Sequence, residues 1–261
     1  MKLVTPSVYV VSRPQIDWPS IVRYLADEVG VTIDWAGLRG EVPSGEALIE
    51  FMARLCYRSF EPGLNANVTK VRENRADYFE NILQSRHGSV LAHVHYSFVF
   101  HNVSRVFTHE VVRHSAGTDI SQESLRYVRL DQIKFWLPQW AQDDRELHDR
   151  CEHVINMLEN YQKWMAEHFK LDDPGTPFAE KKHKTSFMRR FAPLGLATSI
   201  GMTFNVRALR HVIETRYSGH AEEEMQVVMP LLFDIMKREL PLLFNDYVVT
   251  PAGLETPHRK V

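Results

Sequence analysis

The hydrophobic period changes within one continuous stretch of the sequence, and this change constrains the fold more than any other feature. Over residues 93–101 apolar and polar residues alternate, which predicts a half-buried strand. Over residues 102–114 the apolar residues recur at helical spacing, which predicts a helix. The apolar positions of the two segments are Val94, Tyr96, Phe98, Phe100, Val103, Phe107 and Val111. A strand that leads directly into an amphipathic helix points to a chain that mixes sheet and helix.

Turn signals and hydrophobic periods predict the other elements. Further strands are expected at Val8–Val11, at Tyr127–Leu130 and within Phe191–Phe204. Further helices are expected at Trp18–Val29, from Ser44 as N-cap to Tyr57, and at Val71–Ser85, Asp143–Lys170, Asn205–Tyr217 and Ala221–Leu240. Helices dominate and strands are not consecutive, so the expected fold class is α+β.

Charge and composition exclude several classes of protein. The net charge is −2, from 31 basic and 33 acidic residues, so no overall positive field attracts nucleic acid or an anionic membrane. No apolar run approaches the ~20 residues that span a bilayer. Cys56 and Cys151 form no C-x-x-C pair, and no secretory signal precedes the first strand. A cytoplasmic location without nucleic-acid or membrane partners is therefore expected.

The first candidate site lies between His87 and Arg126. Six of the thirteen histidines fall between positions 87 and 114, and arginines at 105, 113, 126 and 129 alternate with them. A solvated face of a strand and helix accounts for any one of these histidines. Donors clustered beside a Ser/Thr/Gly-rich loop are more typical of an anion-binding site.

The second candidate site is the helix that Asn205 can cap. Arg216 falls on its inward stripe, four residues after Val212. In the functional interpretation Arg216 contacts a ligand. In the structural interpretation it reaches solvent at the helix end or pairs with Glu222 or Glu223. Spacing alone does not separate these alternatives. Asn205, Arg207 and His211 lie towards another side of the helix.

Several common catalytic motifs are absent from the sequence. It contains no P-loop, no G-x-G-x-x-G turn and no G-x-S-x-G nucleophile elbow. His93 and His95 share one face of the strand predicted over residues 93–101. No recognised spacing of residues in the sequence provides a third metal ligand. No metal site is expected, and a metal-dependent hydrolase or oxygenase is the minority alternative.

The segment Arg113-His114-Ser115, followed after eight residues by Ser124-Leu125-Arg126, resembles the Arg-His-Arg…Ser-x-Arg signature of the flavin-dependent thymidylate synthases (ThyX type). The resemblance extends to two blocks, about residues 80–130 and 185–230. It includes His87-Gly88-Ser89, Ser104-Arg105, His109-Glu110, Arg189-Arg190, Asn205, Arg207, His211, Arg216 and His220-Ala221-Glu222. The resemblance implies a ThyX-like fold, with helices around a small twisted, mainly antiparallel sheet, and one catalytic domain over residues 1–261.

The family resemblance also implies a reaction. Members methylate dUMP at C5 to give dTMP, using methylenetetrahydrofolate as carbon donor, FAD as flavin and NADPH as reductant. No enzyme cysteine adds to the pyrimidine, and neither Cys56 nor Cys151 lies in a matching block. The resemblance further implies a homotetramer whose active sites are shared between subunits.

Site residues transfer by matching position. Arg216 resembles the arginine that binds the uracil and favours its ionisation, and is the expected catalytic residue. The expected flavin contacts are Ser89, Arg113, His114, Ser115, Asn205, Arg207 and His211. The expected nucleotide contacts are Glu110, Arg113, Gln122, Glu123, Ser124, Arg126, Arg189 and Arg216.

The sequence departs from the family pattern near these contacts. Ser115 replaces an arginine, Ala92 replaces a glutamate, and one extra residue leaves either Gln122 or Glu123 in the place of the motif's acidic residue. Glu110 replaces a glutamine, and its carboxylate repels a nucleotide phosphate unless Arg113 neutralises it. The alternatives are therefore methylation of ribose UMP, as in nucleoside antibiotic synthesis, and a catalytically inactive relative that binds nucleotide.

Overall fold

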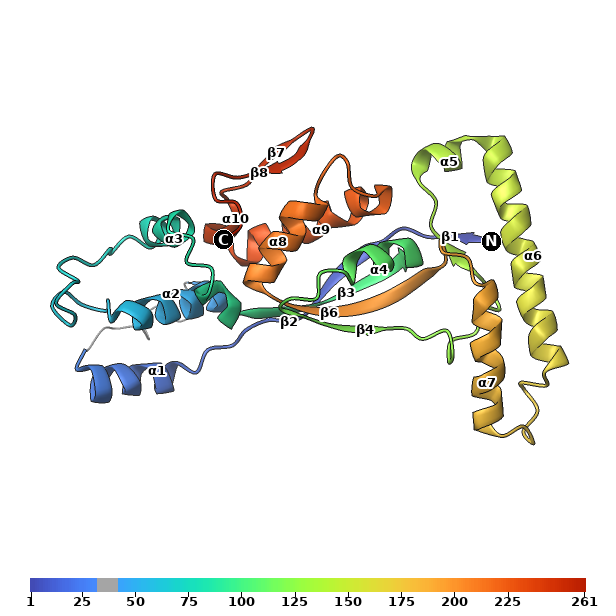
Figure 1. Cartoon of the computed structure of the whole chain (residues 1–261), viewed down its shortest axis with the longest axis horizontal. Coiled ribbons are helices and arrows are strands. Elements are labelled where there is room, and N and C mark those ends of the chain that lie inside the picture. Colours follow the sequence, from blue (N-terminus) through green and yellow to red (C-terminus); the bar gives the residue numbers. More distant parts are fainter. Residues whose placement is uncertain (32–41) are drawn as a thin grey trace.

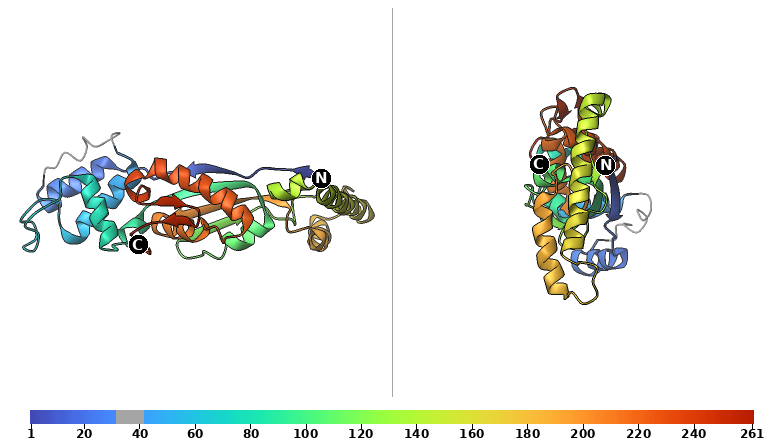
Figure 2. Two further views of the ribbon diagram at one scale, coloured as in Figure 1. Left: turned by 90° about the horizontal axis from the view of Figure 1, so that it is seen from above. Right: turned by 90° about the vertical axis from the view of Figure 1, so that its right-hand side faces the viewer.

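The computed structural model describes residues 1–31 and 42–261 of the 261-residue chain. The molecule is elongated, with a sheet in the middle and helices at both ends (Figures 1 and 2). The sheet has four strands in the order β2-β3-β6-β4, and all three pairings are antiparallel. This arrangement confirms the α+β class and the antiparallel sheet expected from the sequence.

The central strands lie far apart in the sequence but adjacent in space. The four strands are β2 (Ser7–Ser12), β3 (His95–Ser104), β6 (Ala197–Asn205) and β4 (Thr118–Gln122). In the long β3–β6 pairing, His95 lies opposite Asn205 and Ser104 lies opposite Ala197. Two short pairs flank the sheet, one parallel and one antiparallel: β1 (Lys2–Leu3) with β5 (Lys134–Phe135), and β7 (Val248–Thr250) with β8 (Gly253–Glu255).

The main hydrophobic core lies between one face of the sheet and several helices. Phe98, Phe100 and Phe204 point into it and are fully buried. The covering helices are α4 (Arg105–Val111), α8 (Val206–Arg216), α9 (Glu223–Glu239) and α10 (Pro241–Phe244), as Figure 1 shows. Burying one aromatic ring stabilises the fold by about 1.5–3 kcal/mol, so this face holds β3, β6 and the helices in one fixed arrangement.

Helices gather at the two ends of the molecule. At one end lie α1 (Trp18–Tyr24), which continues as a π-helical turn over Leu25–Val29, α2 (Ser44–Tyr57) and α3 (Arg75–Gln84). At the other end an arm contains α5 (Gln139–Asp143), α6 (Arg145–His168) and α7 (Phe178–Met188) (Figure 1). Short 3-10 turns cover Val90–His93 and Arg189–Phe191. No helix in the described ranges is long and apolar enough to cross a bilayer.

Several sequence expectations about boundaries are wrong. The predicted strand at Tyr127–Leu130 is a turn, in which the N–H groups of Tyr127 and Val128 both donate to Ser124 O. The strand on the other side of β6 from β3 is instead β4, which lies at the sheet edge and is mostly exposed. Edge exposure removes the apolar alternation by which a strand is recognised in sequence.

Other differences concern helix starts and faces. Ser44 is the first helical residue of α2, and Pro43 precedes it without a side-chain cap. Leu55, an apolar residue of this helix, is 39% exposed. His93 belongs to a 3-10 turn and not to the strand, and the helix predicted from Asn102 begins at Arg105 because Ser104 caps it.

Candidate functional site

Arg216, the last residue of α8, donates to groups at the end of α4. Its Nε donates to His114 Nε2 at 2.8 Å, and its Nη1 donates to Glu110 Oε2 at 2.7 Å. Its Nη2 donates to the backbone carbonyl of Glu110 at 3.2 Å. Arg216 therefore does not pair with Glu222 or Glu223, and three of its donors converge on residues that lie 102 and 106 positions earlier.

Side-chain caps fix the two helices that meet here. Ser104 Oγ accepts from Phe107 N and thereby caps α4. Asn205 Oδ1 accepts from Ala208 N at 2.8 Å and caps α8, as expected from the sequence. The carboxylate of Glu224 accepts from both the N–H and the hydroxyl of Ser104, so α9 holds the start of α4. Burial is the main cause that raises the pKa of Glu224 to about 7.

His114 is held neutral at the contact with Arg216. Burial, the positive charge of Arg216 and the neighbouring His211 lower the pKa of His114 to about 4. A neutral imidazole has one free nitrogen lone pair, and here Nε2 uses it to accept from Arg216. The ring of His211 lies edge-on to that of His114 with centroids 5.7 Å apart. The arrangement gives a fixed guanidinium between a neutral imidazole and a carboxylate.

Glu110 is neutralised, but not by the expected partner. Sequence reasoning named Arg113 as its counter-ion, whereas the salt bridge is made by Arg216. Arg113 lies on the surface and forms no ion pair with a described residue. The guanidinium of Arg113 thus stays available for an anionic ligand, while Arg216 pairs with Glu110.

The residues expected to contact a flavin lie around the outer side of α8. Asn205 N donates to Gly117 O at 2.9 Å, which pins the loop after His114 against the start of the helix. A Cβ on Gly117 would collide with the Asn205 amide, so the loop needs glycine for this close approach. Ser89, Arg113, Ser115, Arg207 and His211 are all exposed.

The donor set of this region fits a dinucleotide cofactor. Val206 N donates to Val94 O, which places the turn that follows Ser89 beside α8. A Cβ on Gly88 would lie 3.1 Å from Arg207 Nε, so Arg207 passes directly over Gly88. Neither Arg113 nor Arg207 has an ion-pair partner in residues 1–31 and 42–261. Exposed guanidinium groups without counter-ions suit the pyrophosphate of FAD.

The other expected nucleotide contacts gather near the opposite end of α4. Gln122 donates to Thr108 Oγ1 at 3.0 Å, while Glu123 accepts from Ser199 N at 3.0 Å and from Thr198 Oγ1 at 3.3 Å. Ser124 and Arg126 follow on the next turn, where Arg126 N donates to Ser124 Oγ at 3.4 Å. Gln122 and Glu123, the two candidates for the acidic residue of the motif, are thus both held by hydrogen bonds within the chain.

Arg105 belongs to this second group, although sequence reasoning assigned it no individual role. Its Nη2 donates to Glu123 O at 2.9 Å, but its buried Nε has no hydrogen-bond partner among the described residues. Burial is the main cause that lowers the pKa of Arg105. The nearby Glu123 carboxylate acts in the opposite direction, and the positive charge of Arg189 lowers the pKa further. A buried donor without a partner in the described ranges, beside the positive charge of Arg189, suits an anion. The Ser104-Arg105 pair in the family pattern was the signal that could have found it.

The two groups do not meet within one chain. Arg105 is the first residue of α4 and Glu110 is near its end, so they are separated by about 8 Å along the helix. In the described ranges, no hydrogen bond or ion pair joins Arg126 or Arg189 to Arg216. We call these two groups, one around Arg216 and one around Arg105 and Arg126, the two candidate half-sites.

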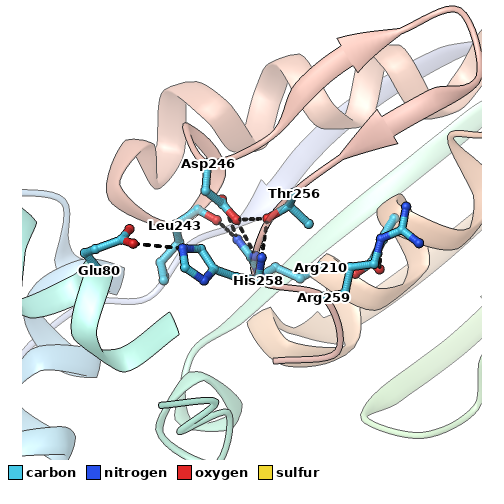
Figure 3. Close-up of polar contacts among 8 residues, drawn as sticks. Glu80, Arg210, Leu243, Asp246, Thr256, His258 and Arg259 are labelled. Atoms are coloured by element: carbon cyan, nitrogen blue, oxygen red, sulfur yellow. Dashed lines mark hydrogen bonds and ion pairs between the residues drawn. The ribbon is translucent and has the colours of Figure 1, made fainter. Parts of the chain in front are cut away.

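A buried ion pair holds the inner side of α8. Arg210 is 2% exposed, and its guanidinium forms two hydrogen bonds with Asp246, at 2.9 and 2.8 Å, and one with Leu243 O. Thr256 donates to the same carboxylate at 2.5 Å, and His258 in the following segment contacts Glu80 of α3 at 3.0 Å (Figure 3). This network ties α8 to the C-terminal segment and to α3, so the face that carries Arg207 and His211 is rigidly supported.

The metal alternative gains no support from the geometry. His93 and His95 no longer share a strand face, because His93 ends the 3-10 turn. Among the residues that the structure describes, no group of three or more His, Cys, Asp or Glu side chains could hold a metal ion.

Comparisons with known proteins agree with the motifs. Residues 38–242 match the family described as thymidylate synthase complementing protein. The flavin-dependent thymidylate synthase of Corynebacterium aurimucosum is 29% identical over 225 residues, covering 84% of this chain and 86% of that protein. The enzyme of Mycobacterium tuberculosis is 31% identical over 212 residues, covering 80% and 82%.

Solved structures share the fold. Thymidylate Synthase X from Helicobacter pylori, determined with FAD and dUMP, is 25% identical with a TM-score of 0.56, covering 77% of this chain and 93% of that one. The UMP/dUMP methylase PolB from Streptomyces cacaoi, bound with 5-Br UMP, is 15% identical with a TM-score of 0.59, covering 94% and 95%. The sequence motifs, the family match and the relatives together identify the chain as a member of the flavin-dependent thymidylate synthase family.

Proposed function

We propose that this chain is an FAD-dependent uridylate C5-methyltransferase that converts dUMP to dTMP, with residues 1–261 as one catalytic domain. Methylenetetrahydrofolate is the carbon donor, and NADPH is the reductant. The observation that carries the proposal is the fixed Arg216–His114–Glu110 cluster beside a surface of unpaired cations. Family membership supports the cofactor, and the exposed Arg113 and Arg207 supply the charges that its pyrophosphate requires.

Arg216 is the catalytic residue of this proposal. The neutral His114 and the carboxylate of Glu110 orient its guanidinium before substrate binds. A guanidinium beside the uracil stabilises the anion formed when N3 loses its proton, and this raises electron density at C5. FAD bound here and reduced by NADPH would supply the hydride for the transferred carbon unit. Ser89, His114, Ser115, Asn205 and His211 are proposed to hold and orient the flavin.

The nucleotide phosphate is assigned to the second half-site. Arg126 and Arg189 supply charge, Ser124 supplies a hydroxyl, and the unpaired Nε of Arg105 supplies a further donor. Charge-assisted hydrogen bonds of this kind are about twice as strong as neutral ones. Gln122 and Glu123 position this turn through their bonds to Thr108 and to strand β6.

The separation of the half-sites supports a shared active site. We propose a homotetramer in which Arg126 and Arg189 of one subunit bind the phosphate of the nucleotide whose base lies at Arg216 of another. No hydrogen bond or ion pair joins the two groups within the described part of one chain, and this supports completion by a second copy.

The decisive experiment compares dUMP and UMP with the purified protein. We expect a yellow protein with bound FAD, NADPH oxidation that accelerates when nucleotide is added, and release of tritium from C5-labelled dUMP. Faster tritium release from UMP would assign the ribose substrate instead. Tight nucleotide binding without tritium release would assign the inactive relative, and a colourless protein that takes up no FAD would refute the proposal.

A further inference from the structure

The hairpin of β7 and β8 contacts α8 but lies beyond the stretch that matches the family. The match ends at residue 242, and the hairpin pairs Val248 with Glu255 and Thr250 with Gly253. None of the residues assigned to the flavin or to the nucleotide belongs to it. Its contacts with the helix that carries Arg216 therefore decide what it can contribute to the reaction.

The base of the hairpin is tied to the middle of α8. Asp246, two residues before β7, accepts two hydrogen bonds from the guanidinium of Arg210, at 2.9 and 2.8 Å (Figure 3). Thr256, directly after β8, donates to the same carboxylate at 2.5 Å. One buried ion pair thus closes both ends of the hairpin onto α8, six residues before Arg216.

The tip of the hairpin is bonded to the turn over residues 217–219, which directly follows α8. Leu254 N donates to Tyr217 O at 3.2 Å, and Gly219 N donates to Ala252 O at 3.1 Å. The turn therefore joins the hairpin as a short third strand, and the backbone that follows α8 is fixed by main-chain hydrogen bonds.

Gly253 allows the turn and the hairpin to approach this closely. It pairs with Ser218 in an antiparallel bridge, and its φ of +130° favours glycine. A Cβ at this position would lie 2.3 Å from Tyr217 O and 3.0 Å from Ser218 Cα, and both of these are backbone atoms. Any side chain here would therefore push the turn, and with it the end of α8, away from the hairpin.

Tyr217 transmits the position of the turn to the catalytic arginine. Its N–H donates to Ile213 O at 2.8 Å, which closes the last turn of α8, and its ring lies edge-on to Phe233 of α9 with centroids 5.9 Å apart. Arg216 immediately precedes it and donates to two acceptors at the end of α4. A shift of the Tyr217 backbone therefore moves the Arg216 backbone relative to these acceptors.

The space that these segments enclose is too small for a cofactor or a substrate. A cavity of about 160 Å³ lies between the 217–219 turn, Gln226 and Pro230 of α9, and the hairpin. Small-molecule sites usually occupy about 300–1,000 Å³. The contacts of the hairpin with the turn therefore support α8 and do not form a ligand site.

We propose that the hairpin β7–β8 holds Arg216 in the position that the reaction requires, with Gly253 as the positioning residue. The inference rests on the proposed function, because Arg216 has a catalytic role only there. The base of the hairpin fixes α8 at Arg210, and its tip fixes the turn after Arg216. The last two turns of the helix, about 9 Å, are thus held at both ends by one hairpin.

The first test is the substitution Gly253→Ala in the FAD-loaded protein. It should lower kcat for tritium release from C5-labelled dUMP by about 10²-fold, since a displacement of about 1 Å can have an effect of this size. KM for dUMP should change little, because the phosphate is assigned to the other half-site.

Gly63→Ala is the matched control. Gly63 also has a positive φ, +88°, but a Cβ there meets no described atom within 4 Å, so the substitution adds backbone strain without the contact. Its kcat should equal that of wild type. An equal loss of turnover in Gly63→Ala and Gly253→Ala would show that strain alone is responsible and would overturn the inference.

Two measurements need no turnover and separate this inference from the proposed function. In hydrogen–deuterium exchange, the amides of Gly219 and Leu254 should exchange faster in Gly253→Ala than in wild type or Gly63→Ala. Phenylglyoxal should also modify Arg216 faster in Gly253→Ala, because the guanidinium leaves its acceptors. An unchanged rate in either measurement would overturn the inference even if dTMP is formed. If the wild-type protein methylates no uridylate, the proposed function is wrong, and these two rates still decide whether the hairpin positions Arg216.

Gly219→Ala is the second variant, for the case that Gly253→Ala yields no folded protein. Its Cβ would lie 3.1 Å from Pro251 O, which is a milder intrusion from the side of the turn. We expect changes of the same kind, but smaller, in kcat, in amide exchange and in the rate of arginine modification. Wild-type values in all three measurements would overturn the inference.

Discussion

Arg216 is the residue on which the proposed chemistry depends. We expect Arg216→Ala to lower kcat for tritium release by about 10²-fold or more, because the group that stabilises the uracil anion is removed. FAD content should fall far less than turnover, since His114 is the one proposed flavin residue to which Arg216 donates a hydrogen bond in the described part of the chain. Arg259→Ala provides the comparison, because Arg259 is 64% exposed in its side chain and lies 3.9 Å from Glu214. Near-normal turnover of the Arg216 variant would remove its assigned role.

His114 gives the site a defined pH dependence. Its pKa is lowered to about 4 in the folded protein, against an ordinary value of 6.5. As pH falls from 6.5 to 4 the unfolded chain takes up the proton first, so stability is full above 6.5 and is lost through this window. His114→Gln should flatten the dependence of the free energy of unfolding on pH between 4 and 6.5, measured by urea denaturation. An unchanged slope would show that His114 does not titrate as described.

The residues of the site could be named from the sequence, but their partners could not. Motif spacing gave Arg216 and His114, and the helical stripe placed Arg216 on the inner side of α8. The bond between them joins positions 102 apart, and no local pattern reports a contact across that separation. For the same reason Arg113 was named as the partner of Glu110, although Arg216 fills that role.

At the scale of elements, α8 depends on the buried pair of Arg210 and Asp246. Arg210→Ala leaves a carboxylate that is 7% exposed without its counter-ion, and we expect a loss of about 3–5 kcal/mol in the free energy of unfolding. Arg13→Ala breaks a bidentate pair with Glu239 at the surface and should cost only about 0.2–1 kcal/mol. Chemical denaturation of both variants measures the difference. Equal losses would mean that the Arg210 network does not anchor α8.

Elements with strong local signals were predicted well, and edge elements were not. Asn205 ends β6 and caps α8, and the sequence indicated both because the cap follows an apolar run directly. Strand β4 was missed, since most of its side chains are exposed and form no apolar stripe. Helix α6 was predicted, but its apolar residues Met157 and Trp164 are more than half exposed. The small clusters of the arm bury Ile155 and Met165 instead, while Trp164 stacks on Tyr161 and His168.

At the scale of the whole molecule, the proposed phosphate half-site and the Arg216 half-site lie at opposite ends of α4, and no hydrogen bond or ion pair joins Arg126 to Arg216 in the described part of the chain. If subunits share sites, Arg216→Ala and Arg126→Ala inactivate different halves of the same active site. Each variant alone should be inactive. When the two are unfolded together and refolded as a mixture, some sites combine an intact Arg216 from one chain with an intact Arg126 from another.

Such complementation gives a quantitative expectation. In a random mixture of equal amounts, about a quarter of the sites should contain both intact arginines, and tritium release should recover to about that fraction of the wild-type rate. A mixture of the two folded variants, combined without unfolding, is the control and should stay inactive unless subunits exchange. If refolded mixtures remain inactive while each variant binds FAD and forms the wild-type oligomer, both arginines must act within one chain. The half-sites would then have to close by a movement of the turn that carries Ser124 and Arg126, and the shared site would be wrong.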